Sequence, residues 1–315
     1  MNSLTQLVGQ DRAVELLSRA IKLNRIAPAY LFSGPSGVGR SLAARCFSEL
    51  LICQGIGDLE KTSIQKRLRA NNHPDRLWVE PTYLHQKKLL SATEAAAMGL
   101  KRKASPQIRI EQVREITQFL SRPPLEATRS IVVIEDAQTM REAAANALLK
   151  TLEEPGKATL ILIATPNSLL PTLVSRTQQI PFYRLSEEDL KQVLRQNNYQ
   201  EILEQKDLLA IAQGSPGDAI ASFSQLEAIP SELLDKLKQS PQTSLEALQL
   251  AKEIDDLLDT QAQLWLANYL QYYYWNRYFK KSVVELLEKT RHCLLSYVQP
   301  RLVWENTFLK LFADR

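Results

Sequence analysis

The segment with the clearest chemistry is a glycine-rich loop that lies between an apolar strand-like run, Ala29 to Phe32, and a helix-like pattern, Leu42 to Ile52. The residues of this loop are Gly34, Pro35, Ser36, Gly37, Val38, Gly39, Arg40 and Ser41. Glycines at this spacing let the backbone curl, so that successive N–H groups and the N-terminus of the following helix point at one anion. The Ser41 hydroxyl is the group that a bound magnesium ion would need. The pattern predicts a phosphate-binding loop, and a purely structural glycine turn is the alternative.

The residue before Ser41 departs from the usual phosphate-loop pattern. That pattern has Lys at this position, because a compact ammonium group on a flexible stem reaches the β- and γ-phosphates. Arg40 keeps the positive charge, but its planar guanidinium is bulkier and donates hydrogen bonds in a fixed fork. The sequence therefore favours binding of a nucleotide such as ATP, accompanied by magnesium, over fast hydrolysis.

Polar side chains also follow two buried-strand patterns. Glu135 and Asp136 come directly after the β-branched run Ser130 to Ile134, and Thr165 follows the apolar run Thr159 to Ala164. Ligands bind at the carboxyl ends of parallel strands, so we expect these side chains beside the phosphate loop, where the two carboxylates would hold magnesium and orient water. The usual order places Asp before Glu, and the reversed order moves each carboxylate by about a methylene, which catalytic geometry does not tolerate. An acidic strand end that only caps the following helix is the alternative.

Alternating apolar runs and helical patterns position these residues. Besides the runs already named, the spacing predicts helices over 7–23, 108–120 and 143–152 and strands over 77–79 and 178–182. Buried strands that alternate with helices around a phosphate loop indicate an α/β fold with a doubly wound parallel sheet. From Arg184 onward only helical patterns occur, which predicts a small helical module over 184–225 and a further helical domain over 226–315.

Composition limits the class of protein. The chain has 315 residues, of which 44% are hydrophobic and 23% charged, and it has no apolar run of membrane-spanning length and no signal-like start. Cys46, Cys53 and Cys293 are too few for a disulfide framework. Cys46 and Cys53 lack the paired spacing of a structural zinc site, so we interpret these two as small core residues. These features predict a cytoplasmic protein with no membrane association.

The basic residues gather in one segment. Ten Lys or Arg and three Asp or Glu lie between Lys61 and Lys103, although the whole chain carries a net charge of +4. A basic patch can bind DNA, but nothing aromatic interleaves the charges from Lys87 to Lys103, which favours a solvated insertion. We expect residues 85–105 to form an irregular, mobile insertion.

The aromatic residues gather elsewhere, between Trp265 and Trp275. Trp265, Tyr269, Tyr272 and Trp275 follow helical spacing. Such side chains can stack on bases, but aromatic residues in a helix more often belong to a core or to a subunit interface.

Several motifs together carry a family resemblance. They are Gly9-Gln10, the Gly34–Ser41 loop, Asn72-His73-Pro74-Asp75, the run from Ala144 to Pro155 and the triplet Ser175-Arg176-Thr177. In this combination the chain resembles bacterial sliding-clamp loaders of the AAA+ class, and among them the delta-prime subunits of DNA polymerase III. The resemblance covers most of residues 1–225, and the last ninety or so residues match only as a helical collar.

The resemblance implies three parts: a P-loop AAA+ domain over 1–183, a helical lid over 184–225 and a collar that joins a pentameric ring over 226–315. It implies delta and gamma/tau subunits as partners, with a sliding clamp and primed DNA reached through the complex. The arginine of the family's Ser-Arg-Cys motif corresponds to Arg176, which would reach the γ-phosphate bound by a neighbouring subunit. An ordinary surface ion pair is the alternative role for Arg176.

The departures from the family pattern agree with one another. Besides Arg40 and the reversed acidic pair, the lid motif has Gly217 where the hydrolysing subunits have a second sensor arginine. Family members also carry a cysteine-rich zinc module, of which this chain keeps only Cys53, so no zinc is expected. These departures predict a largely non-hydrolysing ring member. A working ATPase subunit of the gamma/tau kind and an autonomous DNA-binding module are the competing hypotheses.

Overall fold

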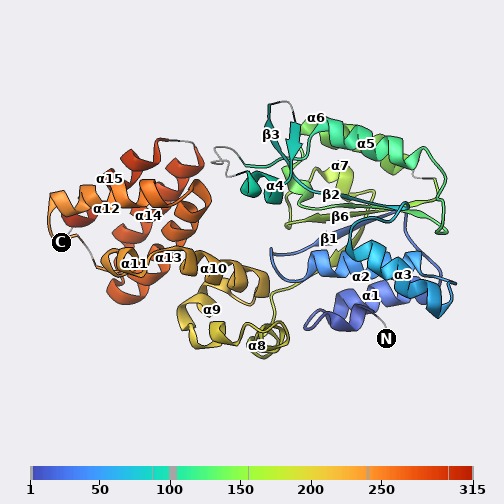
Figure 1. Ribbon diagram of the computed structural model, residues 1–315, viewed down its shortest axis with the longest axis horizontal. Coiled ribbons are helices and arrows are strands. Elements are labelled where there is room, and N and C mark those ends of the chain that lie inside the picture. The colour runs from blue at the N-terminus through green and yellow to red at the C-terminus, as the bar shows by residue number, and fades with distance from the viewer. Residues whose placement is uncertain are drawn as a thin grey trace. The chain divides into compact units, whose positions relative to one another are not determined.

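The computed structural model describes residues 3–86, 88–98, 105–154, 156–239, 241–296 and 298–313 (Figure 1). By internal contacts the described chain divides into two compact units. The first consists of residues 1–99, 105–196 and 214–217, and the second consists of residues 197–213 and 218–315, each within the described ranges. The division into three parts at 183 and 225 remains a prediction.

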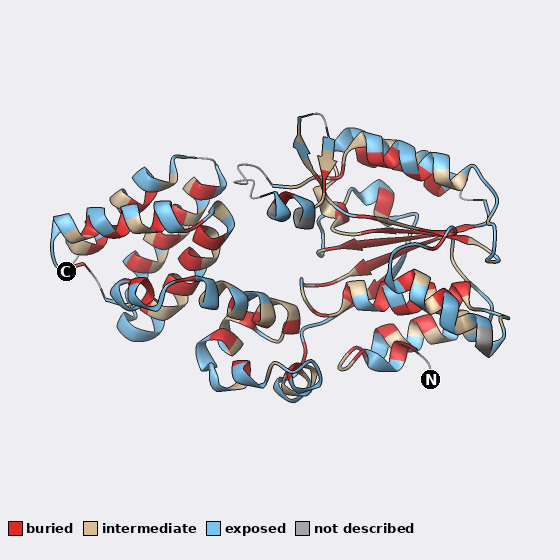
Figure 2. Cartoon of the chain, in the orientation of Figure 1, coloured by how far each residue is buried: buried red, intermediate tan, exposed pale blue. Residues whose placement is uncertain are grey.

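A five-stranded parallel sheet forms the centre of the first unit. Its strand order is β2-β5-β6-β1-β7, with β1 at Ala29–Ser33, β2 at Arg76–Val79, β5 at Ser130–Ile134, β6 at Ala158–Ala164 and β7 at Gln178–Pro181. The strands β5 and β6 are buried along their whole length, as Figure 2 shows, which explains their continuous apolar sequence. The parallel α/β prediction is confirmed.

Helices cover both faces of this sheet (Figure 1). On one face lie α1 (Asp11–Lys22), α2 (Arg40–Ile52) and α3 (Asp58–Arg69), and on the other lie α5 (Ile110–Leu120) and α6 (Glu142–Glu153). Short elements complete the unit: η1 (Ser3–Gln6), η2 (Ala137–Thr139), α7 (Pro171–Val174) and α8 (Glu187–Gln196). Strand side chains alternate between the two layers: Phe32 contacts Phe47 of α2, whereas Leu31 belongs to the core under α5 and α6.

The segment predicted as an irregular insertion has regular structure in its described part. The strands β3 (Tyr83–His85) and β4 (Lys88–Leu90) pair as an antiparallel hairpin, and α4 (Ala92–Ala97) follows. A capping box begins α4: Ser91 Oγ accepts a hydrogen bond from the Glu94 N–H, and the Glu94 carboxylate accepts one from the Ser91 N–H. Residues 87 and 99–104 lie outside the described residues, as does Pro155 of the predicted helix stop.

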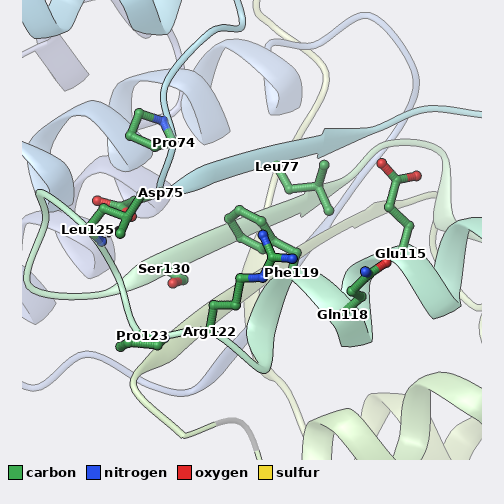
Figure 3. Close-up of a pocket in the computed structure, with 10 residues that line it drawn as sticks. All are labelled: Pro74, Asp75, Leu77, Glu115, Gln118, Phe119, Arg122, Pro123, Leu125 and Ser130. Atoms are coloured by element: carbon green, nitrogen blue, oxygen red, sulfur yellow. Dashed lines mark hydrogen bonds between the residues drawn. The ribbon is translucent and has the colours of Figure 1, made fainter.

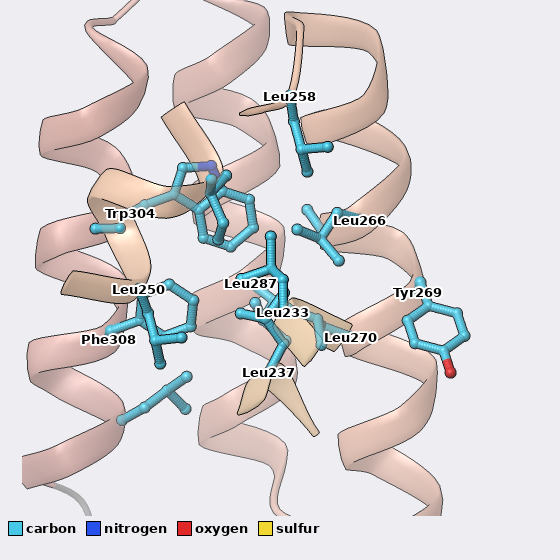
Figure 4. Close-up of a cluster of buried hydrophobic side chains, with 14 of the residues drawn as sticks. Leu233, Leu237, Leu250, Leu258, Leu266, Tyr269, Leu270, Leu287, Trp304 and Phe308 are labelled. Atoms are coloured by element: carbon cyan, nitrogen blue, oxygen red, sulfur yellow. The ribbon is translucent and has the colours of Figure 1, made fainter. Parts of the chain in front are cut away.

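The second unit is built from helices alone in its described residues. They are η3 (Gln200–Glu204), α9 (Lys206–Ala212), most of α10 (Pro216–Ala228), α11 (Ser231–Leu237), α12 (Ser244–Leu257), α13 (Thr260–Tyr278), α14 (Lys281–Leu295) and α15 (Pro300–Ala313). Their core is a single cluster around Leu266, Leu270 and Trp304 (Figure 4). The Trp304 indole N–H donates to the Gln263 amide oxygen at 2.9 Å, so the buried ring leaves no unsatisfied donor.

The aromatic run on α13 divides between core and surface. Tyr269 and Tyr274 are buried, and Trp265, Tyr269 and Tyr273 stack in sequence at a spacing of four residues. Trp275 at the end of the run is exposed. None of the described helices is long and apolar enough to cross a bilayer.

Candidate functional site

The phosphate loop begins where β1 ends, and close packing explains its first glycine. A Cβ atom at Gly34 would lie 2.5 Å from the carbonyl oxygen of Phe182, just beyond β7, so no larger residue fits there. Gly37 and Gly39 have φ angles of 68° and 100°, which place both in the left-handed region that favours glycine. Gly39 then caps α2, and its carbonyl accepts the first helical hydrogen bond from the Ala43 N–H.

Three consecutive carbonyl groups of the loop accept hydrogen bonds from residues outside it. The Ser215 hydroxyl donates to Ser36 O at 2.9 Å, the Gly217 N–H donates to Gly37 O at 2.9 Å, and the Gln10 amide donates to Val38 O at 3.2 Å. In a planar trans peptide the C=O and the next N–H point in opposite directions. The N–H groups that follow these three carbonyls therefore face away from the contacting residues, as an anion-binding nest requires. The loop fits a phosphate group.

The hydroxyl predicted to ligate magnesium is directed at a carboxylate. Ser41 Oγ donates a hydrogen bond to Glu135 Oε1, and the other oxygen of Glu135 accepts from the Trp78 indole N–H at 2.9 Å. Asp136 has a left-handed backbone with φ 46°, and its carboxylate accepts from the Gln138 amide at 3.0 Å. The structure therefore joins Glu135 to Ser41 and turns Asp136 toward its own loop.

The remaining predicted site residues lie close to the loop in the fold. Arg40 is buried at the first position of α2, with only 5% of its surface exposed. Thr165 follows β6, the neighbour of β1, and is half-buried at the same edge of the sheet. For ATP and magnesium, Gly37, Val38 and Gly39 would hold the phosphates through their N–H groups, and Ser41 with Glu135 would supply the oxygen ligands. Among the described residues no cluster of three His, Cys, Asp or Glu side chains suited to a metal ion occurs.

Several residues of this region had no predicted role. The Arg45 guanidinium lies 4.5 Å from the centre of the Trp78 ring, which holds the indole that contacts Glu135. Burial raises the pKa of Glu80, and the neighbouring Glu135 carboxylate adds to that shift. Glu80 directly follows β2, so it lies at the carboxyl end of a parallel strand, as Glu135 does. Ligands bind at these strand ends, so the same reasoning could have selected Glu80. Gln10 bridges the loop to Tyr183, which it contacts through both its amide N–H, at 2.7 Å, and its oxygen.

Gly217, at the position of the missing sensor arginine, lies directly against the phosphate loop. A Cβ atom on Gly217 would approach Gly37 Cα to 2.6 Å, so an arginine does not fit this arrangement. The first turn of α10 is therefore joined to the loop through main-chain and hydroxyl hydrogen bonds. A charged side chain that could contact a nucleotide is absent from this position.

Arg176 lies near the amino-terminal ends of the parallel strands, whereas the phosphate loop lies at their carboxyl ends. It precedes β7, whose residue Gln178 pairs with Tyr30 near the start of β1, whereas the loop follows the end of β1. Arg176 and the phosphate loop are therefore separated by about the length of β1, which is roughly 16 Å. The Arg176 guanidinium pairs with Glu153 at 2.8 Å and donates to Thr172 O at 3.1 Å, and 39% of the side chain is exposed.

A pocket of about 420 Å³ lies at the amino-terminal ends of the strands, between α5 and the starts of β2 and β5 (Figure 3). Phe119, Leu77 and Leu125 form its apolar lining, and Arg122 and Glu115 contribute charged groups. None of these residues was predicted as a site. The buried thiol of Cys46 fits its predicted role as a small core residue, because burial raises its pKa to about 11 and so keeps it protonated.

Comparison with known proteins agrees with this fold and loop. Residues 9–186 match the family described as "DNA polymerase III, delta subunit", and residues 188–311 match the "Cyanobacterial DNA polymerase III delta prime, C-terminal domain". The chain is similar to the DNA polymerase III subunit delta' of Bacillus subtilis, with 33% identity over 180 residues that cover 56% of this chain and 48% of that protein. It is also similar to the subunit delta' of Pseudomonas aeruginosa, with 34% identity over 199 residues that cover 60% of this chain and 54% of that protein.

The chain thus spans about half the length of these curated relatives. A solved structure of a DNA polymerase III gamma subunit-related protein from Thermotoga maritima has the same fold, with a TM-score of 0.55 at 17% identity over 96% of this chain and 99% of that one. The first family match covers more than half of the chain. This protein therefore belongs to the DNA polymerase III delta-subunit family, and its C-terminal part matches the domain described for cyanobacterial delta prime.

Proposed function

We propose that this protein is a largely non-hydrolysing member of a clamp-loader ring in the bacterial cytoplasm, with delta and gamma/tau subunits as partners. In this role it supplies Arg176 to the ATP site of a neighbouring subunit while the ring places a sliding clamp on primed DNA. The family match and the relatives named delta' support the ring membership.

The position of Arg176 is the observation that carries the proposal. Because the length of β1 separates it from its own phosphate loop, Arg176 is poorly placed to act on a nucleotide in the same subunit. Its guanidinium lies on the surface, and its ion pair with the exposed Glu153 is of the kind that contributes at most about 1 kcal/mol. A neighbouring phosphate can therefore compete for Arg176 at small cost. An arginine supplied in trans stabilises the charge of a transferring phosphoryl group.

The contacts of the phosphate loop support a stationary subunit. Gln10, Ser215 and Gly217 hold the loop from outside, and these bonds do not involve a nucleotide. The nest is consistent with weak binding of ATP and magnesium. Hydrolysis needs a water-orienting carboxylate and a cation on the γ-phosphate. Here the Asp136 carboxylate accepts a hydrogen bond from Gln138, and the sensor position is Gly217. The preformed nest also keeps the competing hypothesis, a gamma/tau-like ATPase, open to test.

The test is reconstitution with delta and gamma/tau subunits, with wild type compared with Arg176→Ala. We expect the variant ring to assemble and to lose phosphoryl transfer by about 10³-fold at the one site that Arg176 completes. Single-turnover release of the γ-phosphate measures this loss, and size-exclusion chromatography measures assembly. Unchanged DNA-stimulated turnover in an assembled Arg176→Ala ring contradicts the proposal.

Two controls separate the trans role from a structural one. Glu153→Ala removes the ion-pair partner but leaves the guanidinium, so it should retain turnover. Arg195→Ala removes an exposed arginine from α8 and should change nothing. The purified chain alone should have negligible ATPase activity. Appreciable turnover that Glu135→Gln abolishes would favour the gamma/tau-like alternative instead.

A further inference from the structure

The C-terminal end of α13 and the residues after it form an exposed aromatic and basic surface, which we call the aromatic platform: Trp275, Arg277, Tyr278, Phe279, Lys280 and Lys281. Every residue from 275 to 282 is exposed. The three aromatic side chains are exposed by 44%, 42% and 71% in chain order. The preceding rings behave differently, since Tyr274 is buried and donates its hydroxyl to Leu237 O at 2.6 Å. Core packing therefore explains the earlier part of the aromatic run and leaves the platform unexplained.

The backbone conformation of Phe279 is energetically unfavourable for a residue with a bulky side chain. Phe279 ends α13 in the left-handed conformation with φ 51°, and its N–H donates to Trp275 O at 2.9 Å. Glycine or asparagine is the usual residue at such a helix end, and a bulky side chain with positive φ is an outlier. The Phe279 ring packs edge-on against Trp275, with centroids 5.9 Å apart. The two rings therefore hold each other on the surface.

The charged residues within the platform's own segment have a single sign. Residues 272–281 contain Arg277, Lys280 and Lys281 and no Asp or Glu. The Arg277 guanidinium lies 6.0 Å from the centre of the Tyr278 ring. Lys281 pairs with Glu285 at 3.3 Å, but both side chains are more than half exposed, so the pair is weak. Lys280 and Lys281 also begin α14, where the helix dipole disfavours cations.

We propose that the aromatic platform binds single-stranded DNA by stacking bases on Trp275 and Phe279, while Arg277, Lys280 and Lys281 contact the backbone phosphates. Exposed rings interleaved with cations are the features that bind single strands without sequence preference. A duplex buries its base faces, so it offers these rings nothing to stack on. The basic stretch Lys87–Lys103 carries charge without any aromatic residue. This inference does not depend on the role of Arg176.

The first experiment measures binding of a fluorescent oligothymidylate of roughly 16 nucleotides to the full chain by anisotropy at low salt. Trp275→Ala and Phe279→Gly should each weaken binding by roughly 5- to 150-fold. Phe279→Gly is the sharper variant, because glycine suits φ 51° and the fold should keep its thermal stability while affinity falls. Leu302→Ala and Leu309→Ala, which truncate exposed apolar side chains of α15, are matched controls and should bind as wild type.

A second readout tests the stacking and the charges separately. Oligothymidylate should quench the fluorescence of Trp275, and Trp275→Phe should retain most of the affinity while losing the quench. Lys280→Gln with Lys281→Gln should lower the slope of log affinity against log salt concentration by about 1.4. Wild type that does not bind the oligonucleotide, or platform variants that bind it like the controls, would overturn the proposal. A polyglutamate peptide that binds as tightly and is lost equally in Phe279→Gly would also overturn it, in favour of an acidic protein partner.

Discussion

At the scale of single residues, Gly217 shows how one small side chain changes the relation between a helix and a phosphate loop. The missing Cβ atom allows α10 to begin within hydrogen-bond distance of Gly37, and Ser215 adds a second bond to Ser36. An arginine at this position would require a space between the helix and the loop. Glycine at position 217 therefore has two effects: the sensor arginine is lost, and the direct contact with Gly37 becomes possible.

We expect Gly217→Ala to destabilise the protein by about 1 to 3 kcal/mol, because the added Cβ meets the Gly37 backbone at 2.6 Å and the backbone must shift. Urea denaturation followed by circular dichroism measures the change. The control is Gly57→Ser, which places a larger side chain at the N-cap of α3, where a Cβ has no heavy atom within 4 Å. Equal stability of the two variants would show that the Gly217–Gly37 contact contributes nothing.

At the scale of elements, the turn His73-Pro74-Asp75 before β2 anchors the loop that leads into β5. The Asp75 carboxylate accepts hydrogen bonds from the N–H groups of residues 125, 126 and 127, at 2.7 to 2.8 Å. His73 Nδ1 accepts the Asp75 N–H at 3.2 Å, so the neutral imidazole carries its proton on Nε2. Glu126 is fixed further by the two hydrogen bonds from Arg67. Two adjacent strands are therefore joined by a buried polar turn.

The turn should make stability depend on pH. Burial lowers the pKa of His73 below its ordinary value of 6.5, and the Arg67 charge adds to that shift. Between the lowered pKa and 6.5 the unfolded chain binds the proton more readily, so the free energy of unfolding is fully retained above about pH 6.5 and falls as the pH drops below it. The slope from this one group is at most about 1.4 kcal/mol per pH unit.

The measurement is the free energy of unfolding of wild type and His73→Gln between about pH 5 and 7. The variant should show a shallower pH dependence than wild type in this range. His292→Gln, which changes a side chain that is 67% exposed on α14, is the control and should follow wild type. A His73→Gln profile parallel to that of wild type would exclude the buried imidazole as the source.

At the scale of the whole molecule, the described residues contain two units with separate cores. One core surrounds the sheet, and the other surrounds Leu266 and Trp304 in the helical unit. Large proteins with separate cores commonly unfold in more than one step. The two proposals concern different units, since Arg176 belongs to the first and the aromatic platform to the second.

We expect Leu266→Ala and Leu160→Ala, both at fully buried positions, to destabilise different units by about 2 to 5 kcal/mol each. In differential scanning calorimetry, Leu266→Ala should shift one transition and Leu160→Ala another. Hydrogen exchange then assigns each transition to its unit. A single transition that both variants shift equally would mean that the two units unfold together.

The sequence by itself determined the order of strand, glycine loop and helix, the parallel sheet and the family, because glycine positions and apolar periodicity are local properties. Arg40, Gly217 and Arg176 could be selected from motifs alone. The hairpin of β3 and β4 was missed because each of its strands has only three residues, too few for a clear alternating pattern.

Only the tertiary structure decided which of these residues meet. It directs Glu135 rather than Asp136 toward Ser41, joins Gly217 to Gly37 and separates Arg176 from the phosphate loop by the length of β1. The physical reason is that strand register and the packing of a helix end on a loop depend on residues that are far apart in the chain. Their mutual distances are set when the core packs and are absent from any local pattern.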